Sequence, residues 1–205
     1  MKKVIFITCL LLLSPFYSSA SSLSDGALLK AKLAKFQQIN ADFVQRVVSP
    51  EGELLNESKG QFTISRPGKF RWETITPEEE LIVSDGKTMW LYSPFIEQVT
   101  LINLKDAIQG TPFVLLSGAN DLQWKNYKVT KDKNKFTIVS LNPDEKKNSF
   151  IFEFAKNGNI SRFFVIEEQG QSSEFTLTYK PALENIGSNY FTFKIPADVE
   201  IDDQR

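Results

Sequence analysis

The spacing of hydrophobic residues along the chain changes near residue 40. Before that point Leu29, Leu33 and Phe36 recur at intervals of four and three, which predicts a short amphipathic helix. Ser24 or Asp25 can cap its first turn. Beyond residue 40, apolar and polar residues mostly alternate in short segments, which is the period of a half-buried β-strand. The pattern therefore predicts one N-terminal helix followed by a mainly β chain.

Turn residues separate these strand segments at short intervals. Asp85-Gly86 favours a type I′ hairpin turn, and Asn157-Gly158 and Gly170 mark two further reversals. Pro67-Gly68 turns the chain between two aromatic-rich strands. Twelve segments have a strand-like pattern, from which we expect a sheet of about eleven strands: residues 40–47, 60–65, 70–75, 81–84, 88–92, 96–101, 122–130, 135–141, 149–154, 160–167, 174–179 and 191–195.

Two short helices are expected to interrupt the strands. Asn103 can cap a helix over residues 104–109, which Gly110 closes. Thr111-Pro112 then begins another over residues 113–116. No crossover helices separate the strands, so the sheet should be antiparallel, and a sheet this long must curl. We expect one mainly β (α+β) domain, a barrel or half-barrel with an apolar concave face and short helices across its open mouth.

Residues 1–20 have the pattern of a secretory signal: two lysines, an apolar run and small residues before Ala20. The alternative is an uncleaved anchor, but the apolar run is about half the roughly 20 residues that a spanning helix needs. Cys9 lies inside the run, too early to be a lipidation site. We expect cleavage after about Ala20, leaving residues 21–205 as the exported domain, without cysteine and so without disulfides.

Composition excludes several kinds of chemistry. The 205-residue chain has no His and one Cys, which removes Ser-His-Asp and Cys-His catalysis and zinc sites built on imidazole or several thiolates. A net charge of −1 gives no electrostatic signature for nucleic acid. The carboxylates of residues 78–80, 167–168 and 202–203 are neighbours on strands or loops, and strand neighbours point to opposite faces. We expect no enzyme, cofactor or metal; an enzyme would need an Asp/Glu pair converging in the cavity.

Phenylalanine is abundant, at 17 residues. Each large apolar side chain could be ordinary core, but together, on a curled sheet with a helical cover, they could enclose an apolar ligand. The candidates from the pattern are Phe62, Phe70, Trp72, Met89, Phe113, Leu116 and Phe163, with Phe36 from the first helix and Ile64 beside the turn.

Arg66 ends a strand beside these aromatic residues. It could be a solvated turn arginine. It could also act as a latch, because guanidinium has five fixed donors, keeps its charge and can bind several carbonyls at once. The short helices predicted in the middle of the chain have carbonyls at their C-terminal ends that lack a hydrogen-bond partner within the helix, and Arg66 could bind these.

Several segments closely resemble the LolA family of periplasmic outer-membrane lipoprotein carriers. The most specific are residues 65–72 and 82–100, and residues 104–107, 111–113 and 202–205 fit as well. The similarity runs over essentially the whole exported chain. It implies an unclosed antiparallel β-barrel with a three-helix lid. It also implies a non-enzymatic periplasmic carrier that takes acylated lipoproteins from an inner-membrane ABC transporter to an outer-membrane receptor.

The resemblance also assigns roles to particular side chains. The family's functional arginine corresponds to Arg66, which would bind lid carbonyls when the cavity is empty and release them when ligand enters. The other matched positions are Phe70, Trp72, Leu33 in the lid helix, Phe113 and Leu116 in the second lid segment, and Phe163 or its neighbour Phe164. The related receptor is lipid-anchored, whereas this chain lacks a cysteine at its expected mature N-terminus, which favours the soluble carrier, expected as a monomer. The alternative is a general carrier of free fatty acids or other small lipids.

Overall fold

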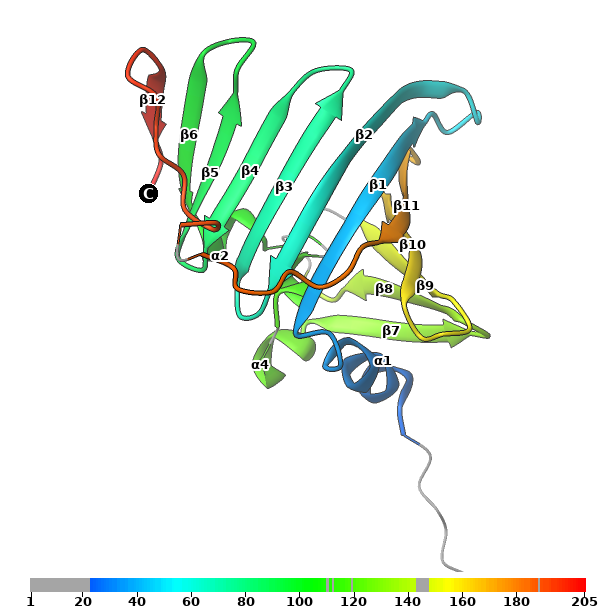
Figure 1. Ribbon diagram of the computed structural model, residues 1–205. Coiled ribbons are helices and arrows are strands. Elements are labelled where there is room, and N and C mark those ends of the chain that lie inside the picture. The colour runs from blue at the N-terminus through cyan, green and yellow to red at the C-terminus, as the bar shows by residue number, and fades with distance from the viewer. Residues whose placement is uncertain (1–22, 110, 112, 119, 143–147, 188) are drawn as a thin grey trace, which may run out of the picture.

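The computed structural model describes residues 23–109, 111, 113–118, 120–142, 148–187 and 189–205. The predictions about the signal at residues 1–20, Gly110 and Pro112 lie outside these residues. The described residues form twelve strands in one curled sheet (Figure 1), in the order β12-β6-β5-β4-β3-β2-β1-β11-β10-β9-β8-β7. Among them, no helix has the length and apolar character needed to span a membrane. The fold class predicted from the pattern is confirmed.

The elements follow the chain in a simple order. The helices are α1 (Asp25–Leu33), α2 (Leu104–Ala107), α3 (Phe113–Leu116) and α4 (Asp121–Trp124). The strands are β1 (Gln38–Val48), β2 (Leu54–Ser65), β3 (Lys69–Thr76), β4 (Glu80–Asp85), β5 (Thr88–Ser93), β6 (Gln98–Asn103), β7 (Tyr127–Asp132), β8 (Lys135–Ser140), β9 (Ser149–Phe154), β10 (Ile160–Ile166), β11 (Ser172–Tyr179) and β12 (Glu200–Asp203).

Local chemistry fixes the first helix and the clearest hairpin. The Ser24 hydroxyl accepts a hydrogen bond from the Ala27 amide at 3.2 Å, so Ser24 is the N-cap of α1. Leu29 and Leu33 are the buried residues of α1, and this helix packs by β7 (Figure 1). Between β4 and β5, Asp85 Oδ1 accepts hydrogen bonds from the Lys87 and Thr88 amides. Gly86 lies in the same turn with a φ of 99°, which glycine adopts without strain. The predicted N-cap is present, and the chain reverses at Asp85-Gly86 as predicted. The turn is not type I′, however, because Gly86 has a positive φ and its neighbours Asp85 and Lys87 do not.

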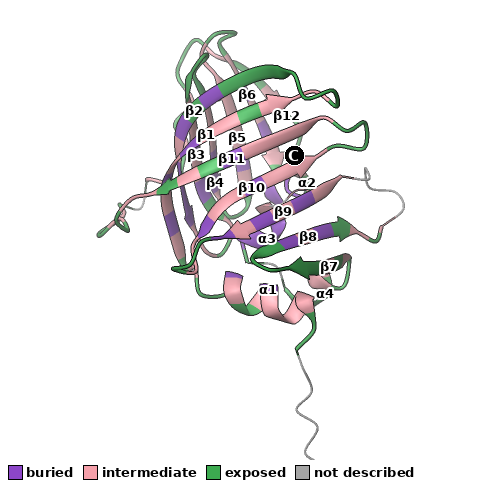
Figure 2. Ribbon diagram, turned by 90° about the vertical axis from the view of Figure 1, so that its right-hand side faces the viewer, coloured by how far each residue is buried: buried purple, intermediate pink, exposed green. Residues whose placement is uncertain are grey.

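The concave face of the sheet carries the core, and burial alternates along the strands (Figure 2). A close approach at Gly60 shapes its centre. A Cβ added there would lie 2.0 Å from the Glu73 carbonyl oxygen and 2.7 Å from the Phe43 ring. The missing side chain lets Phe43 lie over β2 and stack on Trp72, with ring centroids 4.2 Å apart.

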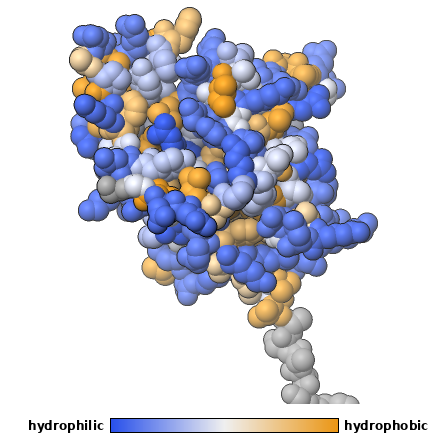
Figure 3. All heavy atoms as spheres, viewed as in Figure 1, coloured by the Kyte–Doolittle hydropathy of each residue, from blue (hydrophilic) through white to orange (hydrophobic). Residues whose placement is uncertain are grey.

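The convex face is crossed by the segment between β11 and β12 (Figure 1). The Tyr190 hydroxyl lies 3.1 Å from the Thr63 hydroxyl, and the Phe193 ring packs on Tyr92 at 5.1 Å. The segment leads to β12, which pairs with β6. The molecular surface on this side is predominantly hydrophilic, with hydrophobic residues scattered across it (Figure 3).

Three element predictions need correction. Residues 122–130 begin as α4, because Asn120 and Gln123 form a capping box, and the strand starts only at Tyr127. Residues 191–195 form no strand, and the last strand is instead β12, parallel to β6, so the sheet is not wholly antiparallel. A turn in which the Glu97 amide donates to the Pro94 carbonyl delays β6 to residue 98.

Candidate functional site

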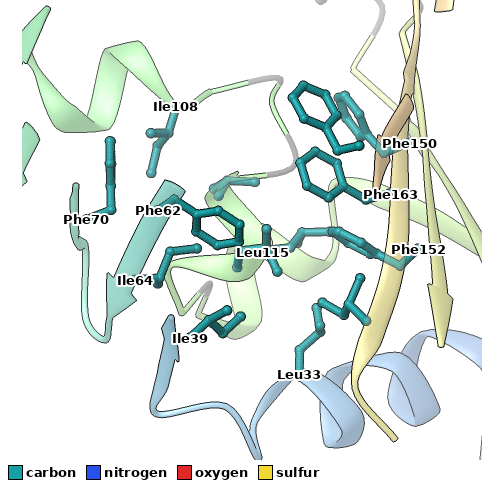
Figure 4. Packing of buried hydrophobic residues seen from close by; sticks show 14 of the residues in the cluster. Leu33, Ile39, Phe62, Ile64, Phe70, Ile108, Leu115, Phe150, Phe152 and Phe163 are labelled. Atoms are coloured by element: carbon teal, nitrogen blue, oxygen red, sulfur yellow. The ribbon is translucent and has the colours of Figure 1, made fainter. Parts of the chain in front are cut away.

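The helices α2 and α3 cover the concave face of the sheet. The close view in Figure 4 places Leu115 of α3 between Phe62 of β2 and Phe152 of β9. Leu115 is 1% exposed and belongs to one hydrophobic cluster with both rings. The described part of α3 is buried at Val114, Leu115 and Leu116, so this short helix contributes to the core as well as covering it.

Beside α3 lies a hollow of about 320 Å³ on the concave face. Its wall is formed by β1, β3, β4, β5 and β11, and its cover by Ala107 of α2, Phe113 of α3, and Ile108 and Thr111 from between these helices. The lining residues are Gln45, Phe70, Trp72, Thr74, Glu80, Ile82, Met89, Ala107, Ile108, Thr111, Phe113 and Phe175. Aromatic and aliphatic side chains dominate this set, which is typical of a site for an apolar ligand.

Trp72 lies at the centre of the aromatic wall. Its ring stacks on Phe62 at 5.0 Å and meets Phe175 edge-on at 5.6 Å. On the cover, Phe113 meets Trp72 edge-on at 5.7 Å and stacks with Phe70 at 5.7 Å. Phe113 therefore joins cover and wall through ring contacts, and movement of α3 away from the sheet would open the hollow at this residue.

Arg66 joins the β2–β3 turn to the end of α3. Its Nε donates to the Leu116 carbonyl at 2.7 Å, and its Nη2 donates to the Leu115 carbonyl at 3.2 Å. These are carbonyls at a helix C-terminus, which have no partner within the helix. The Gly68 amide adds a third link by donating to the Ser117 carbonyl at 3.1 Å. Burial lowers the pKa of the Arg66 guanidinium from its ordinary value, and arginine nevertheless keeps its charge.

The predicted cavity residues divide into two groups. Phe70, Trp72, Met89 and Phe113 line the hollow. The others lie outside its lining: Leu33, Phe62, Ile64, Leu116 and Phe163 are buried in the surrounding core, and Phe36 packs against that core half-buried. The division follows from α3, which occupies the concave face over β2 and β9 and leaves the neighbouring stretch over β3 to β5 open.

Several lining residues were missed from the sequence. Ile82 and Phe175 are apolar residues in alternating strand segments, and both line the hollow. Ile82 lies opposite Trp72 in the β3–β4 register and so on the same face of the sheet. That signal could have found Ile82. Ala107 and Ile108 line the hollow from the first predicted helix, and Thr111 lines it from the stretch between the two predicted helices. No strand alternation applies to these three residues.

The strand register at Phe163 is now defined. Phe163 is buried and stacks on Phe175 with centroids 4.2 Å apart and planes 9° apart. The next ring, Phe164, is half-buried on the opposite face, where the Arg162 guanidinium lies 5.5 Å from its centroid. Of the two alternatives, Phe163 is the inward-facing residue.

Tyr179 packs against the core outside the lining of the hollow, and its pKa is shifted as well. Tyr179 ends β11, and its hydroxyl accepts a hydrogen bond from the Ile160 amide at 3.2 Å. Burial raises the pKa of Tyr179 to about 12. In the described part of the chain, no three His, Cys, Asp or Glu residues are grouped so that they could hold a metal ion. What the site offers is an apolar volume and a hydrogen-bonded cover.

Comparisons with known proteins point to one family. Residues 34–194 match the family model described as outer membrane lipoprotein carrier protein LolA. A protein of Psychromonas ingrahamii called outer-membrane lipoprotein carrier protein is 57% identical over 205 residues, covering 100% of both chains. One of the same name from Aeromonas salmonicida is 46% identical, also covering 100% of both. The solved structure of an uncharacterized conserved protein from Thermus thermophilus is similar in fold, with a TM-score of 0.53 and 14% identity over 86% of this chain and 96% of that one.

Proposed function

The chain belongs to the LolA family of outer membrane lipoprotein carrier proteins, and from this membership we propose that its concave hollow shelters the acyl chains of lipoproteins. The observation that supports this most directly is the apolar hollow of about 320 Å³ between the aromatic wall and a cover held by hydrogen bonds. The carrier acts in the periplasm. It performs no chemical step on its cargo.

The physical need for such a carrier follows from the cargo. An acyl chain of about 15 methylenes gains roughly 12 kcal/mol on leaving water. Release of a lipoprotein into the aqueous periplasm would therefore be very slow. A carrier must bury the chains for the whole journey and hand them over by direct contact at each end.

Arg66 is proposed to act as the latch of the cover. Its bonds to the Leu115 and Leu116 carbonyls hold α3 against the sheet when the hollow is empty. Entry of acyl chains displaces α3 and breaks these bonds. Their re-formation then favours release, because the closed carrier regains two hydrogen bonds from a charged donor. The candidates now found in the core, such as Phe62 and Phe163, would become lining once α3 moves.

The partners and the route are part of the same proposal. An inner-membrane ABC transporter supplies the lipoprotein, and an outer-membrane receptor accepts it from a monomeric carrier. Export depends on the signal at residues 1–20, which is cleaved after about Ala20.

Mass spectrometry of the carrier purified under native conditions tests the function. The carrier is produced with an acylated lipoprotein or with the same polypeptide whose acylated cysteine is replaced by serine. We expect a one-to-one complex with the acylated form and none with the serine form. Recovery of free fatty acids with no lipoprotein would overturn the proposal in favour of a general lipid carrier.

A further inference from the structure

The concave face divides into an apolar and a polar half at the same level on neighbouring strands. On β3, Phe70 and Trp72 are followed on the same face by Thr74. On β1, Phe43 is followed by Gln45, and on β4, Ile82 is preceded by Glu80. The change from apolar to polar therefore runs across the sheet as a row.

The strand register aligns the residues of this row. Gln45 is opposite Ser58, and Thr74 is opposite Glu80. Beyond the row lies a second hollow of about 270 Å³, lined by Gln45, Asn56, Ser58, Thr74, Pro77, Glu78, Glu79, Glu80 and Ser93. It shares Gln45, Thr74 and Glu80 with the apolar hollow. We call these three residues the polar shelf. A molecule with an apolar and a polar end can therefore lie across both hollows.

Hydrogen bonding at the shelf leaves groups available for a ligand. The Ser58 hydroxyl, on a residue only 5% exposed, donates to Gln45 Oε1 at 3.0 Å. This bond holds the carboxamide in place. Within the described residues, Gln45 Nε2 has no acceptor, and the Thr74 hydroxyl and the Glu80 carboxylate have no side-chain partner. The shelf thus presents a donor, a hydroxyl and a carboxylate in one row.

From this arrangement we propose that the polar shelf binds the first peptide groups of the acylated polypeptide, next to the lipid-bearing cysteine. The inference rests on the proposed function and deepens it. A peptide supplies both N–H donors and carbonyl acceptors, which match the Gln45 amide, the Thr74 hydroxyl and the Glu80 carboxylate. A fatty acid or anionic phospholipid would instead place its negative head beside Glu80, with residues 78 and 79 adding two further carboxylates. The shelf therefore favours lipopeptides over anionic lipids.

Displacement of a fluorescent acyl probe by three competitors tests this selectivity. The competitors are a short dipalmitoylated cysteinyl peptide, dipalmitoylglycerol with the same chains and no peptide, and palmitate. In the Q45L/T74V double variant we expect lipopeptide affinity to fall about tenfold, the loss of roughly two neutral hydrogen bonds, while dipalmitoylglycerol affinity is unchanged. In Glu80→Gln we expect palmitate to bind several-fold more tightly. Thr176→Val, the same change at an exposed position of β11, serves as the matched control.

The outcomes separate the shelf from the carrier function. An equal loss of affinity for lipopeptide and dipalmitoylglycerol in the Q45L/T74V variant would overturn the proposed role of the polar shelf. No change in either affinity in the folded variant would overturn it too. Both results would leave the proposed carrier function intact. The unaltered protein provides a test that needs no variant to fold: equal affinity for the lipopeptide and for dipalmitoylglycerol would also overturn the shelf. Failure of the unaltered protein to bind any lipopeptide would instead contradict the proposed function itself.

Discussion

Replacing Arg66 by leucine removes the latch while keeping an apolar stem at the same position. Among the described residues, three hydrogen bonds join the β2–β3 turn to the end of α3. The change deletes two of them and leaves the bond from the Gly68 amide to the Ser117 carbonyl. A hydrogen bond from a charged donor contributes about 1.5 kcal/mol at the low end of its range, which suits a half-buried side chain. The closed cover should therefore lose about 3 kcal/mol, which is roughly a 150-fold shift toward the open form.

Native-state hydrogen exchange measures this shift directly. The Gly68 amide donates to the Ser117 carbonyl of the cover, and the Ser117 amide donates to the Phe113 carbonyl within the cover. The exchange of both amides should therefore accelerate by about 100-fold in Arg66→Leu. In Arg66→Lys the exchange rates should lie between those of the unaltered protein and those of Arg66→Leu, because one ammonium group cannot replace the two guanidinium nitrogens that donate to the cover. Arg46→Leu is the matched control, since Arg46 lies on β1 with a side chain 54% exposed and a 3.8 Å contact to Glu57.

Transfer of cargo gives the functional counterpart. With purified carrier and receptor, Arg66→Leu should load lipoprotein and then retain it, because closing no longer returns the latch energy. Unchanged exchange at Gly68 and Ser117 together with undiminished transfer would refute the latch. Accelerated exchange with normal transfer would show that the bonds stabilise the cover without driving release.

Three further changes probe the wall, the sheet and a buried hydroxyl. Phe70→Glu places a carboxylate against the cover and should reduce lipoprotein loading at least tenfold while circular dichroism still reports the sheet; normal loading would count against a lining role. Gly60→Ala should cost about 1–3 kcal/mol in urea unfolding, because its Cβ meets the Glu73 carbonyl at 2.0 Å, whereas Gly187→Ala, which meets nothing within 4 Å, should cost little. Tyr179 has a pKa raised by burial in the folded protein, so its contribution to stability is present below about pH 10 and should be lost as the pH rises toward about 12. Tyr179→Phe should remove this part of the fall in unfolding free energy with pH. An unchanged fall in the variant would contradict the assignment.

Local signals predicted much of the fold. The Asp85-Gly86 turn and the alternation on either side of it defined the β4–β5 hairpin, because both are properties of adjacent residues. The helix α4 was missed because Leu122 and Trp124 alternate like strand residues; the capping box from Asn120 to Gln123 was the signal that distinguishes the two. The strand β12 depends on pairing with β6, about 100 residues earlier in the chain, and its mostly polar residues carry no hydrophobic alternation.

The site was harder to predict in detail than the fold. Arg66 was identified as a donor to helix-end carbonyls, but which carbonyls it binds depends on where α3 docks. The same docking decides that Phe62 lies under α3 while Met89 lines the hollow. Residue type and periodicity give the face on which a side chain lies, and only the packing of the cover decides whether it borders open space.

The central claim is that acyl chains enter the hollow beneath the α2–α3 cover, and photo-crosslinking tests it most directly. A photoreactive phenylalanine analogue at position 70 points into the hollow, and the same analogue at position 71 lies on the opposite face of β3. With a loaded lipoprotein, we predict adducts to the acyl chains from position 70 and none from position 71. Equal crosslinking from both positions, or adducts from position 71 alone, would contradict the claim.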